Sequence, residues 1–167
     1  MKPTYARSAV LAAAVCAGVV VLPSVSGQEA RAAAPDSVHV MVTPADVQWV
    51  DGPGSLPPGG KFAVVEGDPK NAALFTMRLK LPAAYRIPAH WHPADEHVTV
   101  ISGTFHMGMG DKLDTTKGKA LGAGSFAVMP TRAHHYAWTN EETVIQLHGM
   151  GPWGINYVNP ADDPRKK

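Results

Sequence analysis

Cysteine, strong net charge and nucleotide-binding loops are scarce or missing in this chain of 167 residues. Its one cysteine is Cys16, and its formal net charge is +1, so no basic field points to nucleic acid or to an anionic membrane. No glycine-rich loop opens a helix that would hold a nucleotide, and no G-x-S-x-G segment presents a nucleophilic serine. The sequence therefore argues against nucleic-acid binding and against these two classes of enzyme.

The N-terminus has the layout of a secretory signal peptide. Lys2 and Arg7 precede an apolar run, Ser8–Leu22, which proline and small residues follow. The run is shorter than the roughly 20 residues that span a bilayer, which favours a cleaved signal over a retained membrane anchor or a lipoprotein. We therefore assign residues 1–32 to a signal peptide and expect an exported protein, periplasmic or secreted.

Removal of the signal changes what chemistry the mature chain can do. Cleavage after Gly27 or within Ala30–Ala34 would remove Cys16. The mature protein would then have no disulfide, no thiolate nucleophile and no sulfur ligand for a metal. We also expect it to have no integral membrane segment.

Short alternating or apolar runs with frequent turns predict an all-β domain. Fifteen prolines and sixteen glycines favour turns over long helices. We divide the rest of the chain into a loop-rich lead-in at 33–60, with a short edge strand near Val47–Val50, a β-domain at 61–160 and a flexible tail at 161–167. Strands are expected at Phe62–Glu66, Leu74–Leu81, Tyr85–His92, Glu96–Ser102, Thr104–Met109, Ser125–Met129, His134–Thr139, Thr143–His148 and Ile155–Val158. Ser102-Gly103 is a candidate for a tight hairpin turn, and the pattern favours a sandwich or small barrel.

A histidine pair within this domain has the spacing of a metal site. His90 and His92 share one face of a strand, because residues two apart do so, and their imidazoles can converge on one ion. Pro93 breaks the strand and can turn Glu96 back to the same ion. Imidazole and carboxylate ligands suit divalent Fe, Mn, Ni, Cu or Zn. The simpler alternative is a set of hydrogen-bonded core histidines.

A second cluster completes a resemblance to a known superfamily. His90, His92, Glu96 and Gly103 match the first motif of the cupin superfamily, and Gly124, Pro130 and His135 match its second motif. The chain departs from these motifs at Ala84 and Arg132, where glycine is usual, and at Thr139, where asparagine is usual. Over residues 60–160 it resembles small secreted cupins of the cupin-2 type.

The resemblance implies a fold, a ligand set and an activity. It implies a cupin-type double-stranded β-helix, or jelly-roll barrel, and a homodimer. It selects His135 over the adjacent His134 as the fourth ligand, beside His90, His92 and Glu96. The implied function is a metal-dependent enzyme on a small organic molecule, dioxygenase-like or isomerase-like. The alternatives are a non-enzymatic module that binds a small ligand or a metal, and a barrel that a metal merely stabilises.

Other side chains are candidates for a pocket around the metal, each with a plainer alternative. His106 could equally line the pocket or lie on the outside of the barrel. Trp153 could close one end of the barrel or support a dimer contact. Gln146 and His148, on a later strand, could contact a substrate or reflect ordinary strand polarity. The aromatic residues Phe126 and Trp138 could belong to the core instead. The candidate pocket residues are His106, Gln146, His148, Phe126 and Trp138.

Overall fold

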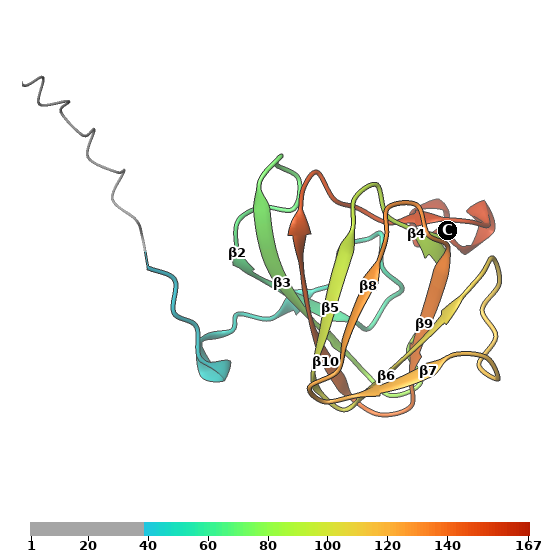
Figure 1. Cartoon of the computed structure of the whole chain (residues 1–167), viewed down its shortest axis with the longest axis horizontal. Coiled ribbons are helices and arrows are strands. Elements are labelled where there is room, and N and C mark those ends of the chain that lie inside the picture. The colour runs from blue at the N-terminus through green and yellow to red at the C-terminus, as the bar shows by residue number, and fades with distance from the viewer. Residues whose placement is uncertain (1–38) are drawn as a thin grey trace, which may run out of the picture. The chain divides into compact units, whose positions relative to one another are not determined.

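The computed structural model describes residues 39–167, which form one unit whose regular secondary structure is almost all short strands (Figure 1). The predicted signal peptide at 1–32 lies outside the described residues. Short 3-10 turns occur at Pro44–Asp46, Pro160–Asp162 and Pro164–Lys166. The strands are β1 Val50–Asp51, β2 Lys61–Glu66, β3 Leu74–Leu81, β4 Arg86–Trp91, β5 Glu96–Ser102, β6 Thr104–Met109, β7 Lys119–Gly122, β8 Phe126–Met129, β9 His135–Thr139, β10 Thr143–Met150 and β11 Asn156–Tyr157.

Two antiparallel sheets face each other across the core of this unit. The first sheet has the strand order β1-β2-β3-β10-β5-β8, and the second has the order β11-β4-β9-β6-β7. From β3 to β6 each successive strand changes sheet, and so do β8, β9 and β10 (Figure 1). Such crossing between two sheets is typical of a jelly roll. The predicted all-β jelly-roll barrel is therefore confirmed.

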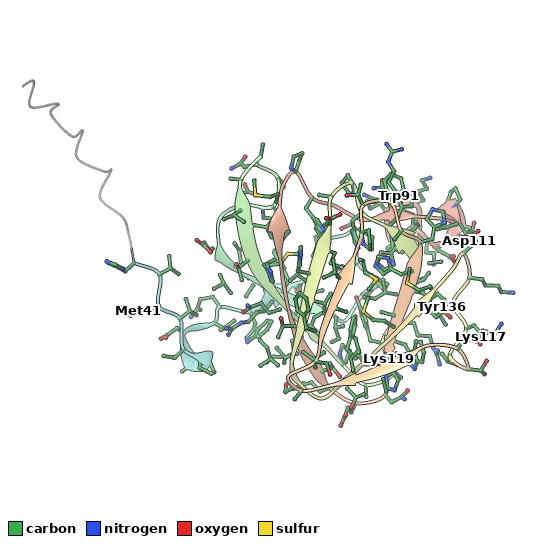
Figure 2. All side chains as sticks on the ribbon, in the orientation of Figure 1. Met41, Trp91, Asp111, Lys117, Lys119 and Tyr136 are labelled. Atoms are coloured by element: carbon green, nitrogen blue, oxygen red, sulfur yellow. The ribbon has the colours of Figure 1, made fainter. Side chains whose placement is uncertain are left out.

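Alternation along the strands places the main core between the sheets. On β3 the side chains of Phe75, Met77 and Leu79 are buried, whereas those between them are only half-buried. The same period of two places Ile145 and Leu147 of β10 in the core, because successive side chains of a strand point to opposite faces. Figure 2 shows side chains filling the space between the two sheets.

The second sheet also carries a small core on its outer face. Tyr136 and Trp138 of β9 are 1% and 5% exposed, and they pack with Leu113 from the β6–β7 loop and Val158 near the C-terminal end. The ring of Tyr136 lies across Gly108, its direct partner on β6, where an added Cβ would come within 2.3 Å of the ring. Strand β9 is thus buried on both faces.

The connection at Gly103 differs from the hairpin expected there. Strands β5 and β6 belong to different sheets, so Ser102-Gly103 turns the chain at a barrel corner and the tight-hairpin prediction is wrong. Gly103 has φ +71°, and an added Cβ would lie 2.4 Å from the carbonyl oxygen of Glu142. A positive φ and close backbone contact both require glycine here.

Several boundaries also differ from the sequence-based assignment. Strand β7, Lys119–Gly122, is absent from the sequence-based assignment. Strand β1 begins at Val50, whereas the predicted edge strand, Val47–Val50, ends at that residue. In the tail predicted to be flexible, the backbone forms two 3-10 turns, and Asp163 is buried and paired with Arg165 at 2.8 Å. Its flexibility stays a prediction.

Two tyrosines attach the lead-in loop to the barrel. The hydroxyl of Tyr85 donates to the carbonyl of Pro57, and that of Tyr157 donates to the carbonyl of Ser55 at 2.8 Å. Leu56, between these two attachment points, packs against the main core. Within residues 39–167 no helix has the length and apolar character needed to cross a membrane.

Candidate metal centre

Three histidines from different parts of the chain meet inside the barrel. His90 on β4 is the direct partner of His135 on β9, and His92 follows β4 immediately. Their side chains are buried, and one ring nitrogen of each lies within 4.8 Å of the others. Antiparallel pairing of β4 with β9 therefore joins histidines that are 45 positions apart in the sequence.

Backbone carbonyls orient all three imidazoles in the same way. The Nδ1 atoms of His90, His92 and His135 lie 2.7, 2.7 and 2.9 Å from the carbonyl oxygens of Pro88, Gly154 and Ala133, respectively. A carbonyl only accepts, so each Nδ1 carries the proton and donates it. Each Nε2 then holds a free lone pair, the form in which imidazole binds a metal.

Glu96, the first residue of β5, faces two of these nitrogens. Its carboxylate lies 3.5 Å from Nε2 of His92 and 3.3 Å from Nε2 of His135. Both nitrogens are buried and have no hydrogen-bond partner among the described residues. A lone pair and a carboxylate are both acceptors, and burying them face to face is costly unless a cation lies between them.

The electrostatics of the cluster keep its donors in metal-binding form. Burial lowers the pKa of His90 to about 3 and also lowers the pKa of His92. Burial alone would raise the pKa of Glu96, but interaction with the neighbouring histidines, that with His92 before that with His135, outweighs burial and lowers that pKa to about 2. Neutral imidazoles and an ionised carboxylate are a donor set that fits a divalent transition metal. The three buried histidines thus form a candidate metal site.

Two loops that carry these candidate ligands are joined to each other. The backbone N–H of Arg132, in the turn before β9, donates to the carbonyl of His92 at 2.9 Å. One carboxylate oxygen of Asp95 accepts from both the N–H and the hydroxyl of Thr131, at 2.7 and 2.8 Å. The turn that leads into His135 is therefore held against the bend between His92 and Glu96.

The cavity beside the histidines is small and mostly apolar. Its volume is about 30 Å³, and Phe105, Met107 and Ala137 are among its lining residues. One water molecule needs about 10–15 Å³ of such space. The cavity therefore suits an ion with one or two waters, and no organic molecule of substrate size fits in it.

Trp153 and Leu56 close this cavity, and the metal prediction did not include them. The indole of Trp153 stacks on the imidazole of His92, with ring centroids 4.3 Å apart and planes at 17°. Leu56 lines the same cavity from the lead-in loop. Of the two alternatives for Trp153, the structure supports closure of the barrel. No signal in the sequence indicated that Leu56, outside the expected β-domain, reaches the histidines.

Neighbouring histidines occupy very different environments. His135 is 1% exposed and lies with His90 and His92. The side chain of His134 is 41% exposed, and its Nδ1 lies 2.6 Å from a carboxylate oxygen of Asp111. His134 precedes β9 and turns outward to Asp111, whereas His135, the first residue of β9, points into the barrel.

The five candidate pocket residues lie on the outer faces of the sheets, and none of them lines the histidine cavity. His106 stacks on Trp138, which belongs to the outer core of the second sheet. Gln146 accepts from Nε of Arg78, His148 stacks on His97, and Phe126 is 56% exposed. On each of these strands the residues beside them point inward, so the structure places the five on the faces that their plainer alternatives implied.

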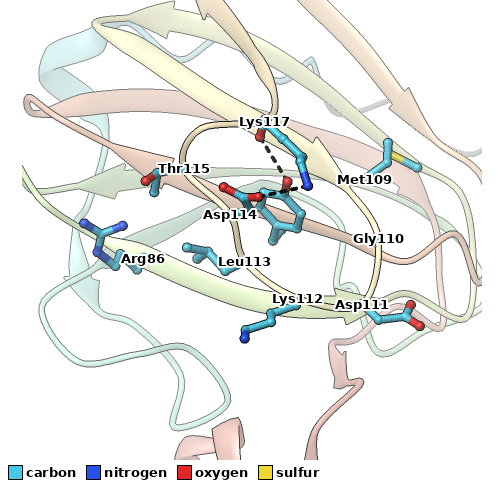
Figure 3. Close-up of a pocket in the computed structure, with 10 residues that line it drawn as sticks. Arg86, Met109, Gly110, Asp111, Lys112, Leu113, Asp114, Thr115 and Lys117 are labelled. Carbon is cyan, nitrogen blue, oxygen red and sulfur yellow. Dashed lines mark hydrogen bonds and ion pairs between the residues drawn. The ribbon is translucent and has the colours of Figure 1, made fainter.

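A polar depression of about 620 Å³ lies elsewhere, at the β6–β7 loop, and Figure 3 shows its lining side chains. Lys117 pairs with Asp114 at 3.2 Å, and its carbonyl accepts from the hydroxyl of Tyr136 at 3.0 Å. The depression shares no lining residue with the histidine cavity. Both acidic side chains of this lining are already paired, Asp114 with Lys117 and Asp111 with His134, which does not favour a metal site.

Solved structures with the same fold include enzymes. The polyketide cyclase RemF from Streptomyces resistomycificus matches with a TM-score of 0.61 and 16% identity, over 77% of this chain and 92% of that one. An acetylacetone dioxygenase from Acinetobacter johnsonii matches with a TM-score of 0.58 and 16% identity, over 78% and 83%. An RmlC-like cupin from Shewanella frigidimarina matches with a TM-score of 0.53 and 17% identity, over 69% and 94%. At these identities the likeness establishes the fold.

A search of curated proteins finds no match to this chain. A family model does match it, over residues 37–154, and its description is the ChrR cupin-like domain. This range holds both histidine segments and every strand from β1 to β10. The chain therefore belongs to the ChrR cupin-like family of the cupin superfamily.

Proposed function

We propose that this chain is a metal-dependent enzyme that acts on a small organic molecule at a centre formed by His90, His92, Glu96 and His135. The observation that carries the proposal is the common orientation of the three imidazoles. Each has its Nδ1 engaged by a carbonyl and its Nε2 free, and the Glu96 carboxylate faces two of the free nitrogens. A dioxygenase-like reaction is consistent with the activity named for one protein of the same fold, an acetylacetone dioxygenase, and an isomerase-like reaction is the other form that we propose.

Each residue would have a distinct role at such a centre. When bound, a divalent metal would orient a substrate and stabilise negative charge that develops on its oxygen atoms. His90, His92 and His135 would supply neutral nitrogen donors that the carbonyls hold in place. Glu96 would supply the carboxylate, and within residues 39–167 no other acidic side chain lines the cavity. Leu56 and Trp153 line the cavity, and by limiting the entry of water they would strengthen the charge interactions inside it.

One observation favours a second candidate function, a non-enzymatic cupin that binds a metal or a small ligand. The cavity of about 30 Å³ leaves no space for a substrate beside the ligands in this arrangement. A protein that only binds a metal needs no such space. The two candidates therefore differ in whether the cavity can open.

Turnover by defined metal forms tests the proposal. We would load the protein separately with Fe(II), Mn(II), Zn(II) and Ni(II), and follow oxygen consumption and product formation with a panel of small organic compounds. We expect one metal form to turn over a compound, and His135→Ala to abolish that turnover while His134→Ala retains it. Stoichiometric metal binding without turnover by any form would support the non-enzymatic candidate instead.

Export and dimer formation are further parts of the proposal. The N-terminal sequence supports export to the periplasm or beyond, and the mass of the mature protein from its native host would locate the cleavage site. A homodimer is supported by exposed Phe126 and Val128 on β8, an edge strand of the first sheet. Sedimentation of the purified protein would measure its oligomeric state.

A further inference from the structure

A second space lies directly beside the histidine cavity. It has a volume of about 270 Å³, and its lining includes Phe62, Met77 and Ile155, with Lys70 the one charged side chain that the described residues contribute to it. It shares four lining residues with the histidine cavity, namely Leu56, Leu79, Trp153 and Ile155. These side chains form the wall between an apolar pocket and the candidate metal centre.

Two side chains of this wall are buried on or beside strands, and the other two belong to loops. Leu79 lies on β3, and Ile155 is buried just before β11, at 5% and 7% exposure. Leu56 and Trp153 are only half-buried, and both come from segments outside the strands. Moving these two side chains disturbs no strand pairing.

Trp153 is poorly tied to its present position by polar contacts. Its backbone N–H donates to the carbonyl of Pro69 at 2.7 Å, but its buried indole Nε1 has no hydrogen-bond partner among the described residues. Burying an indole N–H without an acceptor is unfavourable. Rotation of the ring therefore breaks no side-chain hydrogen bond, although it gives up the stack on His92.

We propose that the 270 Å³ pocket binds the apolar part of a small organic ligand, whose metal-binding oxygen passes between Leu56 and Trp153 to the centre. The ligand class follows from the lining, which is apolar save for one lysine, and from the donor set, which leaves room near the ion for one small group. The proposal deepens the proposed function and rests on it, because it assigns the substrate class to that site. It also resolves the misfit between the 30 Å³ cavity and a substrate.

Three matched probes separate the pocket from the metal. Benzohydroxamate carries a ring and a metal-binding oxygen pair, acetohydroxamate carries the oxygen pair without the ring, and toluene resembles the ring alone. Each is titrated into nitrogen-15-labelled protein with and without one equivalent of Zn²⁺. The readouts are affinity and the Trp153 indole N–H signal, which Trp153→Phe identifies.

The expected results follow from burial of the ring. Zn²⁺-loaded protein should bind benzohydroxamate about tenfold or more tightly than acetohydroxamate. Toluene should shift the Trp153 indole signal with or without Zn²⁺. Ser55→Trp places a bulky ring in the pocket and should remove both effects, whereas Ser102→Trp, at an exposed serine outside the pocket, should retain them. Leu56→Ala should speed association of benzohydroxamate severalfold.

Other results would overturn the assignment, and they differ from failure of the proposed function. Equal affinities for the two hydroxamates on Zn²⁺-loaded protein, or a ring preference that survives Ser55→Trp, would refute the pocket. An association rate that Leu56→Ala leaves unchanged would refute the passage between Leu56 and Trp153. Failure to take up Zn²⁺ at all, measured separately, would refute the metal centre, and a toluene shift blocked by Ser55→Trp would still establish the pocket.

Discussion

Ala84 and Arg132 adopt the same left-handed backbone conformation, with φ of 59° and 63°, in the turns that precede the paired strands β4 and β9. They are the non-glycine residues with positive φ in the described part of the chain. They are also the two positions at which the sequence departs from the glycines of the cupin motifs. The turns thus keep the geometry that glycine would favour, and the departures do not displace His90 or His135.

Restoring glycine at Ala84 should stabilise the protein. A residue other than glycine in the left-handed region costs about 1–2 kcal/mol. Glycine removes this strain but also raises the conformational entropy of the unfolded chain, which offsets part of the gain. We therefore expect Ala84→Gly to raise the free energy of unfolding by about 1 kcal/mol. Ala83→Gly, at a position without positive φ, should lower it. Urea-induced unfolding measures both. An Ala84→Gly protein less stable than the wild type would contradict the strain argument.

Substitution of Arg132 by glycine should stabilise the protein less than Ala84→Gly does. Its guanidinium lies 5.8 Å from the centroid of the Trp91 ring, and such a contact contributes about 0.5–1 kcal/mol at an exposed site. Arg132→Gly relieves the backbone but loses this contact, so we expect a net change near zero. The same unfolding experiment on Arg132→Gly, with Trp91→Ala and the double variant, tests this balance. If Trp91→Ala does not alter the effect of Arg132→Gly, the contact contributes nothing.

Gly108 should be intolerant of any side chain. An added Cβ would come within 2.3 Å of the Tyr136 ring, and the ring is fully buried in the outer core of the second sheet. We expect Gly108→Ala to lower the free energy of unfolding by about 2–3 kcal/mol, as overpacking does. Gly122→Ala is the matched control, since a Cβ added at Gly122 would have no other atom within 4 Å. Equal stability of the two variants would mean that Tyr136 does not pack as described.

Acid should destabilise the metal-free protein. Burial lowers the pKa of His90 from 6.5 to about 3, so between these values the unfolded chain binds more protons than the folded one. The free energy of unfolding then falls as the pH drops below 6.5, by up to about 1.4 kcal/mol per pH unit for this group. The lowered pKa of His92 acts in the same direction, and that of Glu96 does so below 4.5.

Urea unfolding of the metal-free protein from about pH 7 to about pH 4 measures this slope. His90→Gln should reduce the slope, because glutamine does not titrate. A free energy of unfolding that stays constant across this range would show that the histidines are not buried in neutral form.

The sequence predicted the cluster of candidate ligands better than its surroundings, for physical reasons. His90 and His92 could be placed together because strand geometry is local, and motif register brought in His135. Leu56 and Trp153 reach the site through contacts distant in sequence, which no local pattern encodes. Trp138 was misplaced because β9 is buried on both faces, and burial alone does not tell an inner face from a covered outer one. The corner at Gly103 resembles a hairpin in sequence, since both need a glycine with positive φ.

Metal content of the protein purified from its native compartment tests the central claim most directly. Elemental analysis should find about one equivalent of a transition metal in the wild type and in His97→Ala, a histidine on the outer face of the first sheet. His92→Ala should lose most of it, because one of the free buried nitrogens that faces Glu96 is removed. Less than about a tenth of an equivalent of any transition metal in the wild type, unchanged by His92→Ala, would contradict the account.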